Sequence, residues 1–248
     1  MKNIKQIYQL LTKANKQRTL FNTHQEELKI LIKNGDVEKV KSIIDTGINI
    51  NQKGKNSITL LHLACEENNP EMIALLLSYK PNIYCTDKWL RTPIIIIAST
   101  EIKKIKDDNE KELAKRNTRT NAQQLIEYGM SVNERDKLDR TPLMYCAIND
   151  NDTLATYLLT HKKLDITLQD IGGSDALMTS FYESSHNVFK VLTTSARNSE
   201  ELGYCIKYVR VVKGADAPEV KDLEKLKLVT KLEEYLPATA KRYKASKI

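Results

Sequence analysis

The stretch Thr141-Pro142-Leu143-Met144-Tyr145-Cys146-Ala147 decides the fold of this 248-residue chain, because similar stretches recur on either side of it. The copies are Thr59-Leu60-Leu61-His62-Leu63-Ala64, Thr92-Pro93-Ile94-Ile95-Ile96-Ile97-Ala98 and, more weakly, Asp175-Ala176-Leu177-Met178. Thr59 and Thr92 are 33 residues apart, and Thr141 and Asp175 are 34 residues apart. A further step of 33 residues back from Thr59 reaches Glu26-Glu27-Leu28. A period of this length predicts a repeat protein built from stacked supersecondary units.

The second half of each unit keeps the same phase. An aliphatic pair, or its first member, follows each anchor residue by 17 positions, at Ile43-Ile44, Leu76-Leu77, Leu158-Leu159 and Leu192. In the third unit the matching pair, Leu125-Ile126, lies 16 positions later than this rule expects. The distance from Thr92 to Thr141 is 49 residues, which exceeds the period by the same 16 residues (49 − 33). One insertion, at about residues 99–118, therefore explains both irregularities.

Each unit has the pattern of a helical hairpin. A Thr hydroxyl can cap the free N–H groups at a helix start, and Pro fits the first turn because no hydrogen-bond donor is lost there. After Thr141 and Pro142, the apolar residues fall at helical spacing, at Leu143, Met144, Ala147 and Ile148. Because each hairpin leaves an apolar face uncovered, neighbouring hairpins must stack to bury it.

These stretches resemble the ankyrin repeat, whose pattern is an Asp-x-x-Gly-x-Thr-Pro-Leu-His-x-Ala opening, a Val-x-x-Leu-Leu second helix and a Gly-Ala-x-x-Asn exit. The resemblance implies an all-α solenoid of stacked helix-turn-helix units with short hairpin loops. It covers about residues 22–197 in five units, which are 22–54, 55–87, 88–136 with the insertion, 137–170 and 171–197. The chain departs from the pattern at the turn glycine, which is replaced by Ser57, Leu90 and Asp139, and keeps the motif histidine only as His62.

Helical caps are expected at both ends, because a solenoid must cover its terminal units. Residues 1–21 predict an N-terminal capping helix with Ile4, Ile7, Tyr8 and Leu11 on one face. Residues 198–248 predict a C-terminal helical cap or appendage with a basic tail, and a partner-binding amphipathic helix is the alternative for this segment. The insertion carries charges of both signs, which predicts that it extends the two helices of unit three into solvent; a docking arm is the alternative.

The distribution of charge argues against a nucleic-acid partner. The formal net charge is +7, but residues 1–21 contribute +5 and residues 238–248 contribute +4, so the body of the chain sums to −2 (7 − 5 − 4). Membrane contact through the basic ends stays open as a weaker alternative. No apolar run approaches the ~20 residues of a membrane-spanning helix, and the N-terminus lacks the apolar segment of a secretory signal. The expected location is therefore the cytoplasm.

The chain contains no motif of an enzyme or a metal site. It has no Gly-rich phosphate loop, no Gly-x-Ser-x-Gly elbow and no His-Glu-x-x-His motif. Its four cysteines are scattered without a Cys-x-x-Cys pair, so we expect reduced, buried thiols. Although a Cys/His nucleophile pair stays open, nothing points to one, and the family resemblance implies that His62 braces its hairpin. We expect neither catalysis, nor a cofactor, nor a small-molecule substrate.

The resemblance implies that a protein partner contacts the hairpin tips and the exposed side of each first helix. When the repeat units are aligned with the family pattern, the residues at these contact positions are Lys55, Asn56, Ile58, Glu66, Glu67, Lys88, Trp89, Arg91, Ser99, Lys137, Leu138, Arg140, Ile148, Asn149, Tyr182 and Glu183. Trp89 is the single tryptophan of the chain and has the composition of an interface hot spot. The alternative is that Trp89 lies flat against the next hairpin. At the unit exits, the resemblance implies that Asn51 and Asn133 bridge hairpins by hydrogen bonds.

The leading hypothesis for function is a scaffold that binds a partner protein through the concave face of hairpin tips and first helices. The alternative is a secreted effector of an intracellular bacterium, active in a host-cell cytosol. The Ile-, Lys- and Asn-rich composition and the basic tail at residues 238–248 are similar to those of such effectors.

Overall fold

In the part of the chain that the computed structural model describes, every regular element is a helix. The backbone is described for residues 4–194 and, beyond them, at Gly203, Ile206, Lys207, Arg210, Lys221 and Glu224; side chains are described at residues 12–16 and 24–194 and at these later positions. The helices are α1 (Ile4–Asn34), α2 (Val37–Asp45), η1 (Lys55–Ser57), α3 (Leu60–Glu66), α4 (Pro70–Ser78), α5 (Pro93–Ala98), η2 (Ile102–Lys104), α6 (Asp108–Glu127), α7 (Pro142–Asn149), α8 (Asp152–Leu159), α9 (Ala176–Tyr182) and α10 (His186–Thr194).

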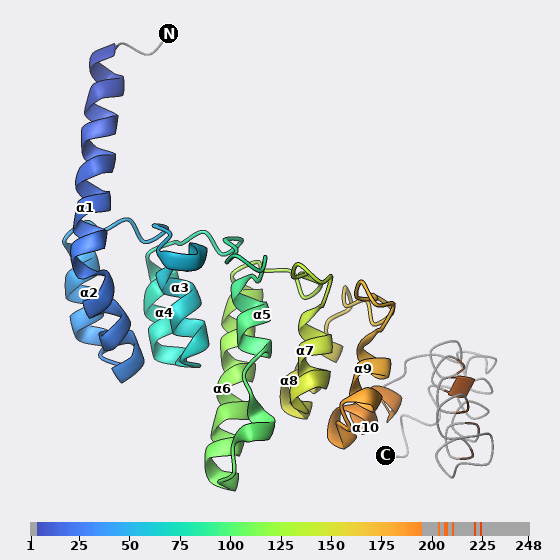
Figure 1. Ribbon diagram of the computed structural model, residues 1–248. Coiled ribbons are helices and arrows are strands. Elements are labelled where there is room, and N and C mark those ends of the chain that lie inside the picture. Colours follow the sequence, from blue (N-terminus) through green and yellow to red (C-terminus); the bar gives the residue numbers. More distant parts are fainter. Residues whose placement is uncertain are drawn as a thin grey trace, which may run out of the picture.

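The helices form hairpins that stack side by side in a single row (Figure 1). Within each hairpin an inner helix packs on an outer helix, as α3 packs on α4 and α7 packs on α8. Each inner helix also packs on the next inner helix, along the series α1, α3, α5, α7 and α9. The outer helices α2, α4, α6, α8 and α10 form a parallel row of their own. The all-α solenoid of stacked hairpins that the repeat implies is confirmed.

The anchor residues of the repeat occupy equivalent places, at the N-caps of successive inner helices. Thr59 caps α3, Thr92 caps α5, Thr141 caps α7 and Asp175 caps α9. The side chains of Thr59, Thr141 and Asp175 accept a hydrogen bond from the amide three residues on, as an N-cap should. Pro93 and Pro142 stand in the first turns of α5 and α7, so the shared phase read from the sequence is the phase of the structure.

The core runs without a break from α1 to α10 and is mostly aliphatic. All six residues of α5, from Pro93 to Ala98, are buried, because this helix has inner neighbours on both sides and α6 behind it. Ala64 and Ala147 are fully buried, and small side chains at these positions allow close helix packing. Burial of an Ile or Leu side chain contributes about 1.5–3 kcal/mol. The stability of the array therefore comes from contacts between neighbouring hairpins.

The N-terminus differs from the prediction of a separate capping helix at residues 1–21. One 31-residue helix, α1, continues from Ile4 into the first inner helix. The physical reason is that residues 4–34 contain neither Gly nor Pro, so nothing in the sequence ends the helix before Asn34. The first half of α1 extends away from the hairpins instead of covering them (Figure 1). The side chains of Ile4, Ile7, Tyr8 and Leu11 lie outside the described residues.

The insertion also differs from the prediction, because it lengthens only one helix of unit three. Inner helix α5 keeps six residues, whereas outer helix α6 has 20 residues and begins at Asp108. Most charged side chains of the insertion are exposed, as expected, but one side of its later turns is buried between neighbouring units: Lys115 has a side chain only 9% exposed, and Thr118 is fully buried. Polar contacts to the adjacent hairpins make this burial possible.

Those contacts tie the insertion to the units before and after it. Asn68, in the α3–α4 turn, donates through Nδ2 to the Ala114 carbonyl (3.0 Å) and accepts at Oδ1 from Asn121 Nδ2 (2.7 Å). On the other side, Lys115 Nζ lies 2.8 Å from an Asp152 carboxylate oxygen in α8. The insertion is thus a brace between units two, three and four.

The C-terminal expectations lie mostly outside the described residues. A cap, an appendage or a basic tail at residues 198–248 is not described, apart from a few positions. Of these, Ile206 is buried and belongs to the same core cluster as α10. Among the described helices, none is long and apolar enough to cross a membrane.

Candidate protein-binding surface

The hairpin tips are built by one recurring device, an aspartate that closes the turn. In unit three, Asp87 Oδ1 accepts from the amides of Trp89 (2.8 Å) and Arg91 (2.9 Å). Asp136 holds the amides of Leu138 and Arg140 in the same way, and Asp170 holds those of Gly172 and Ser174. Each Asp amide also donates to the carbonyl four residues on, as from Asp87 to Arg91. A side chain that bonds its own backbone stabilises a tight turn.

Successive tips are joined by backbone hydrogen bonds. The amide of Lys88 donates to the Asn56 carbonyl (3.0 Å), that of Lys137 to Trp89 (2.9 Å) and that of Ile171 to Leu138 (3.1 Å). The same bond therefore recurs between units two and three, three and four, and four and five. The tips form one continuous ledge, and their relative positions are fixed by main-chain atoms.

Trp89 stands at the tip of unit three and is 45% exposed. Lys88 Nζ lies 4.0 Å from the centre of its ring and Arg91 Cζ 4.8 Å, so the indole contacts cations of its own hairpin. Arg91 is itself held by Asp87, with Nη2 2.8 Å from Oδ2. Trp89 thus does not lie buried flat against the next hairpin, and a large part of its surface faces solvent.

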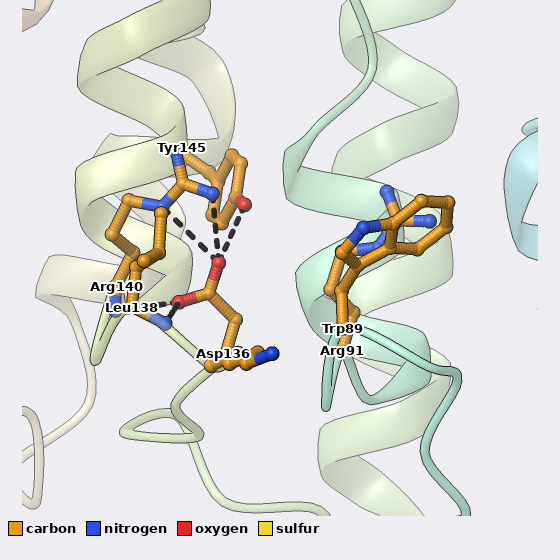
Figure 2. A pocket seen from close by; sticks show the side chains of 7 residues that line it. Trp89, Arg91, Asp136, Leu138, Arg140 and Tyr145 are labelled. Carbon is orange, nitrogen blue, oxygen red and sulfur yellow. Dashed lines mark hydrogen bonds and ion pairs between the residues drawn. The ribbon is translucent and has the colours of Figure 1, made fainter.

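A pocket of roughly 390 Å³ opens between the tips of units three and four. In Figure 2, Trp89 and Arg91 lie on one side and Leu138, Arg140 and Tyr145 on the other. Leu138 is 40% exposed. The pocket therefore offers apolar surface from two hairpins, rimmed by cationic side chains.

The wall on the unit-four side is a fixed ion pair. Asp136 Oδ2 accepts from Arg140 Nη2 (2.9 Å) and from the Tyr145 hydroxyl (2.8 Å), and Arg140 Cζ lies 4.8 Å from the centre of the Tyr145 ring. Burial by itself would raise the pKa of Asp136, but the hydrogen bonds from Arg140, Tyr145 and Leu138 outweigh it and hold this pKa below its usual value. Burial and the bond to Asp136 raise the pKa of Tyr145. At neutral pH the carboxylate is charged and the phenol is neutral.

Acidic side chains stand at the other end of the inner helices. Glu66 and Glu67 are exposed at the C-terminal end of α3, and Glu183 is exposed at that of α9. Partial burial raises the pKa of Glu66, although Arg91 at 3.9 Å opposes the shift. The concave face is therefore basic and apolar at the tips, whereas its base carries both these carboxylates and the exposed Lys103 and Lys104.

Most of the expected contact residues lie on this face, but their side chains differ in solvent exposure. Exposed positions are Lys55, Glu66, Glu67, Lys88, Trp89, Lys137, Leu138, Tyr182 and Glu183. Half-buried positions are Asn56, Ile58, Arg91, Ser99, Arg140 and Ile148. Tyr182, on the last inner helix, stands apart from the pocket and does not line it.

Asn149 does not fit its predicted role as an exposed contact residue. It is only 7% exposed, and its Nδ2 donates to the carbonyls of Ala98 (3.4 Å) and Tyr145 (3.2 Å). The connection after α5 passes this end of α7, since Lys103 Nζ reaches the Glu183 carbonyl on α9 (2.7 Å). Asn149 joins two inner helices and is not a contact residue for a partner.

Two residues that build the pocket are missing from the sequence-based set, Asp136 and Tyr145. The spacing Asp-x-x-x-Arg, which recurs at Asp87–Arg91 and Asp136–Arg140, is the signal that could have revealed the ion pairs. Tyr145 gave no such signal, because its position on α7 belongs to the apolar pattern of the core.

The unit exits carry the expected bridging asparagines. Asn133 Nδ2 donates to the Lys163 carbonyl (2.7 Å), and its Oδ1 accepts from the Asp165 amide (3.1 Å). Asn51 Oδ1 accepts from the Asn82 amide (2.7 Å). Both asparagines thus link one unit to the next.

One cysteine lies close to a histidine, but the pair is not activated. Cys85 Sγ is 3.7 Å from His62 Nδ1 and 3.5 Å from the Thr59 hydroxyl. Burial raises the pKa of the Cys85 thiol and lowers that of His62, so both groups are neutral at pH 7. A nucleophilic cysteine needs the opposite shift. His62 instead bridges hairpins, because Nδ1 accepts from the Thr59 amide and Nε2 faces the Arg91 carbonyl at 3.3 Å.

Comparison with known proteins agrees with this architecture. A family model described as ankyrin repeats (3 copies) matches residues 28–106 and residues 112–201. Rabankyrin-5 of Mus musculus is 29% identical over 136 residues, which are 52% of this chain and 11% of that protein. Serine/threonine-protein kinase 12 of Arabidopsis thaliana is 35% identical over 66 residues, which are 27% of this chain and 14% of that protein.

The chain spans a small part of both relatives, so the similarity concerns a segment of each and not its whole activity. The family model, by contrast, matches more than half of this chain, and its two matched ranges contain the helical hairpins from α2 to α10. The stacked hairpins, their capped inner helices and their tip-to-tip hydrogen bonds agree with that match. The chain belongs to the ankyrin-repeat family.

Proposed function

We propose that this protein is a non-enzymatic scaffold that binds a partner protein through the tips and inner helices of units two to five. Ankyrin repeats are in general protein-interaction modules, and the concave face here has the composition of an interface. The observation that carries the proposal is the exposed pocket between Trp89 and Leu138 on a ledge fixed by main-chain hydrogen bonds. A preformed surface binds with little loss of conformational freedom, which favours recognition by the folded repeats themselves.

The free cysteines support the proposal that the protein binds its partner in a reducing compartment such as the cytoplasm. Cys65, Cys85 and Cys146 are buried free thiols. Disulfides are rare in cytosolic proteins, where thiols are kept reduced.

The double variant Trp89→Ala/Leu138→Ala tests the proposal. Aromatic anchors in the centre of an interface typically contribute about 2 kcal/mol or more, so we expect at least a ~30-fold loss of affinity for a partner identified with the wild-type protein. Folding should change little, because neither side chain belongs to the buried core and the bonds at the tips come from backbone atoms. Calorimetry of the purified pair and thermal unfolding of each variant give the two readouts.

Tyr128→Ala is the matched control, because it removes an exposed aromatic side chain at the end of outer helix α6 that does not line the pocket. It should leave the affinity unchanged. An identified partner that binds the double variant as tightly as the wild type would disprove the proposed surface.

A further inference from the structure

The tips of units two, three and four each carry a lysine at the same position of the turn. Lys55, Lys88 and Lys137 directly follow the residue that closes each hairpin, and all three side chains are exposed. In unit five the same position holds Ile171. The series is therefore a row of cations over three consecutive units that ends at an apolar side chain.

The spacing of this row is set by the backbone. The amides of Lys88 and Lys137 are the donors of the bonds that join neighbouring tips. The lysine main chains cannot move apart without breaking those bonds, although the ammonium groups keep the freedom of their long side chains. A partner would meet charges at a fixed interval.

Apolar side chains alternate with the cations along the ledge. Trp89 follows Lys88, and Leu138 follows Lys137, and these two residues line the pocket between the tips. The pocket also contains Arg91, Lys137 and Arg140 against one carboxylate, that of Asp136. Arg140 is paired with Asp136, which also accepts from Tyr145 and two backbone amides, and Arg91 is paired with Asp87. Lys137 is therefore the cation of the pocket that is left for an acidic ligand.

Two carboxylates below the tips of units two and three limit which anions fit on this part of the face. Glu66 and Glu67 lie at the far end of α3, and Arg91 reaches from the tip to within 3.9 Å of Glu66. A nucleic acid, which carries a phosphate at every nucleotide, would place some of its charge near these carboxylates. A peptide can carry carboxylates only where it meets the tips, so the charge pattern favours a polypeptide.

We propose that the tips bind an acidic protein segment, with one apolar side chain in the pocket between Trp89 and Leu138 and flanking carboxylates at Lys88 and Lys137. The inference rests on the proposed function and names the chemistry of the partner. Salt should weaken this binding, because the lysines are exposed and screened by ions.

Fluorescence anisotropy with a defined probe tests the inference. The probe is a fluorescein-labelled 13-residue peptide of alternating Asp and Ser with a central Phe; one counterpart has Lys for Asp and another has Ala for Phe. We expect the Asp/Phe peptide to bind the full chain more tightly than either counterpart. Lys88→Glu/Lys137→Glu should weaken it by about tenfold or more, since like charges then face each other.

Lys162→Glu/Lys163→Glu is the matched control, because it makes the same change of net charge at two exposed lysines that follow α8. It should leave the affinity within about twofold, because neither lysine lines the pocket and ions screen exposed charges. Equal losses in both variants would overturn the inference, because net charge alone would then explain the binding. Absence of binding to the Asp/Phe peptide, or preference for the Lys peptide, would overturn it as well.

Two further outcomes separate the inference from the proposed function. A labelled 13-nucleotide dT strand that bound more tightly than the acidic peptide and lost affinity in Lys88→Glu/Lys137→Glu would assign the row to nucleic acid and overturn the inference. An identified protein partner that is lost with Trp89→Ala/Leu138→Ala but retained by Lys88→Glu/Lys137→Glu would overturn the acidic segment while leaving the scaffold function intact.

Discussion

Leu90 has a backbone conformation that suits glycine better than leucine. Its φ is 61°, in the left-handed region, and it occupies the tip position at which the ankyrin pattern has Gly. Asp139 (φ 58°) and Gly173 (φ 77°) stand at the same position in the next two units. The fold thus imposes one turn geometry on three different residue types, because the bonds of Asp87, Asp136 and Asp170 fix the turn.

Replacement of Leu90 by Gly should stabilise the protein by about 0.5–1 kcal/mol. A left-handed conformation costs an L-residue about 1–2 kcal/mol, which exceeds the ~0.5–1 kcal/mol that the greater freedom of Gly costs in the unfolded chain. Little burial is lost, since Leu90 is 51% exposed. Urea denaturation measures the change. Leu138→Gly, at a tip residue without positive φ, is the control and should not stabilise; equal effects of the two changes would contradict the explanation.

His62 should make stability depend on pH. Burial lowers its pKa, so the folded protein holds this proton less tightly than the unfolded chain. Stability should therefore be complete above the unfolded pKa of about 6.5 and fall as pH drops below it, with a slope of at most ~1.4 kcal/mol per pH unit for one proton. Protonation of Nδ1 would also remove the acceptor of the Thr59 amide.

The variant His62→Gln isolates this contribution. It should be less stable at pH 7.5, by about 1–3 kcal/mol for the lost buried hydrogen bonds. Between pH 7.5 and 5.5 it should lose less stability than the wild type does, and urea denaturation at the two pH values measures the difference. A variant with the same loss as the wild type would show that another group titrates.

At the scale of elements, the lengthened helix α6 depends on polar contacts with neighbouring turns. Asn68 is central to them, and its backbone is left-handed with φ 50°. Asn121, its partner in α6, is fully buried, so the loss of Asn68 would leave an amide without an acceptor inside the protein.

Asn68→Gly should destabilise the protein by about 1–3 kcal/mol, although Gly itself suits the backbone there. The reason is that both side-chain bonds to α6 are lost and Asn121 Nδ2 becomes unsatisfied. Thermal unfolding gives the measurement. Asn56→Gly is the matched control, since Asn56 also has a positive φ (59°) but lies in a turn away from α6. If both variants were equally stable, the brace would not contribute to folding.

The sequence predicts the hairpins well and the insertion poorly, for different physical reasons. Thr-Pro pairs and aliphatic spacing are local signals, and they place α5 and α7 within a residue of their starts. The packing of the insertion depends on contacts across units, as between Lys115 and Asp152, which no local pattern encodes. The mixed charge of residues 99–118 therefore predicts a solvated surface. The structure agrees for most of these side chains but buries Lys115 and Thr118.

For the whole molecule, the repeat phase fixes which residues share a face but not which of them stay accessible. It places Lys88, Trp89, Lys137 and Leu138 on one ledge. It cannot show that the Asn149 side chain is buried in a hydrogen bond to the Ala98 carbonyl. Nor can it show that the Tyr145 hydroxyl donates a hydrogen bond to Asp136 at the tip. These outcomes depend on the side chains of neighbouring hairpins, which differ from unit to unit.

The insertion joins α5 to α6 at the ends of these helices opposite the tips (Figure 1). Trp89 and Lys137 remain bonded tip to tip, although the chain between them is longer than in the other units. The added residues at this turn therefore leave the register of the ledge unchanged. The exposed start of α6 is accordingly a suitable place for a fluorophore or an affinity tag, since a label there would lie at the end of the hairpins opposite the tips.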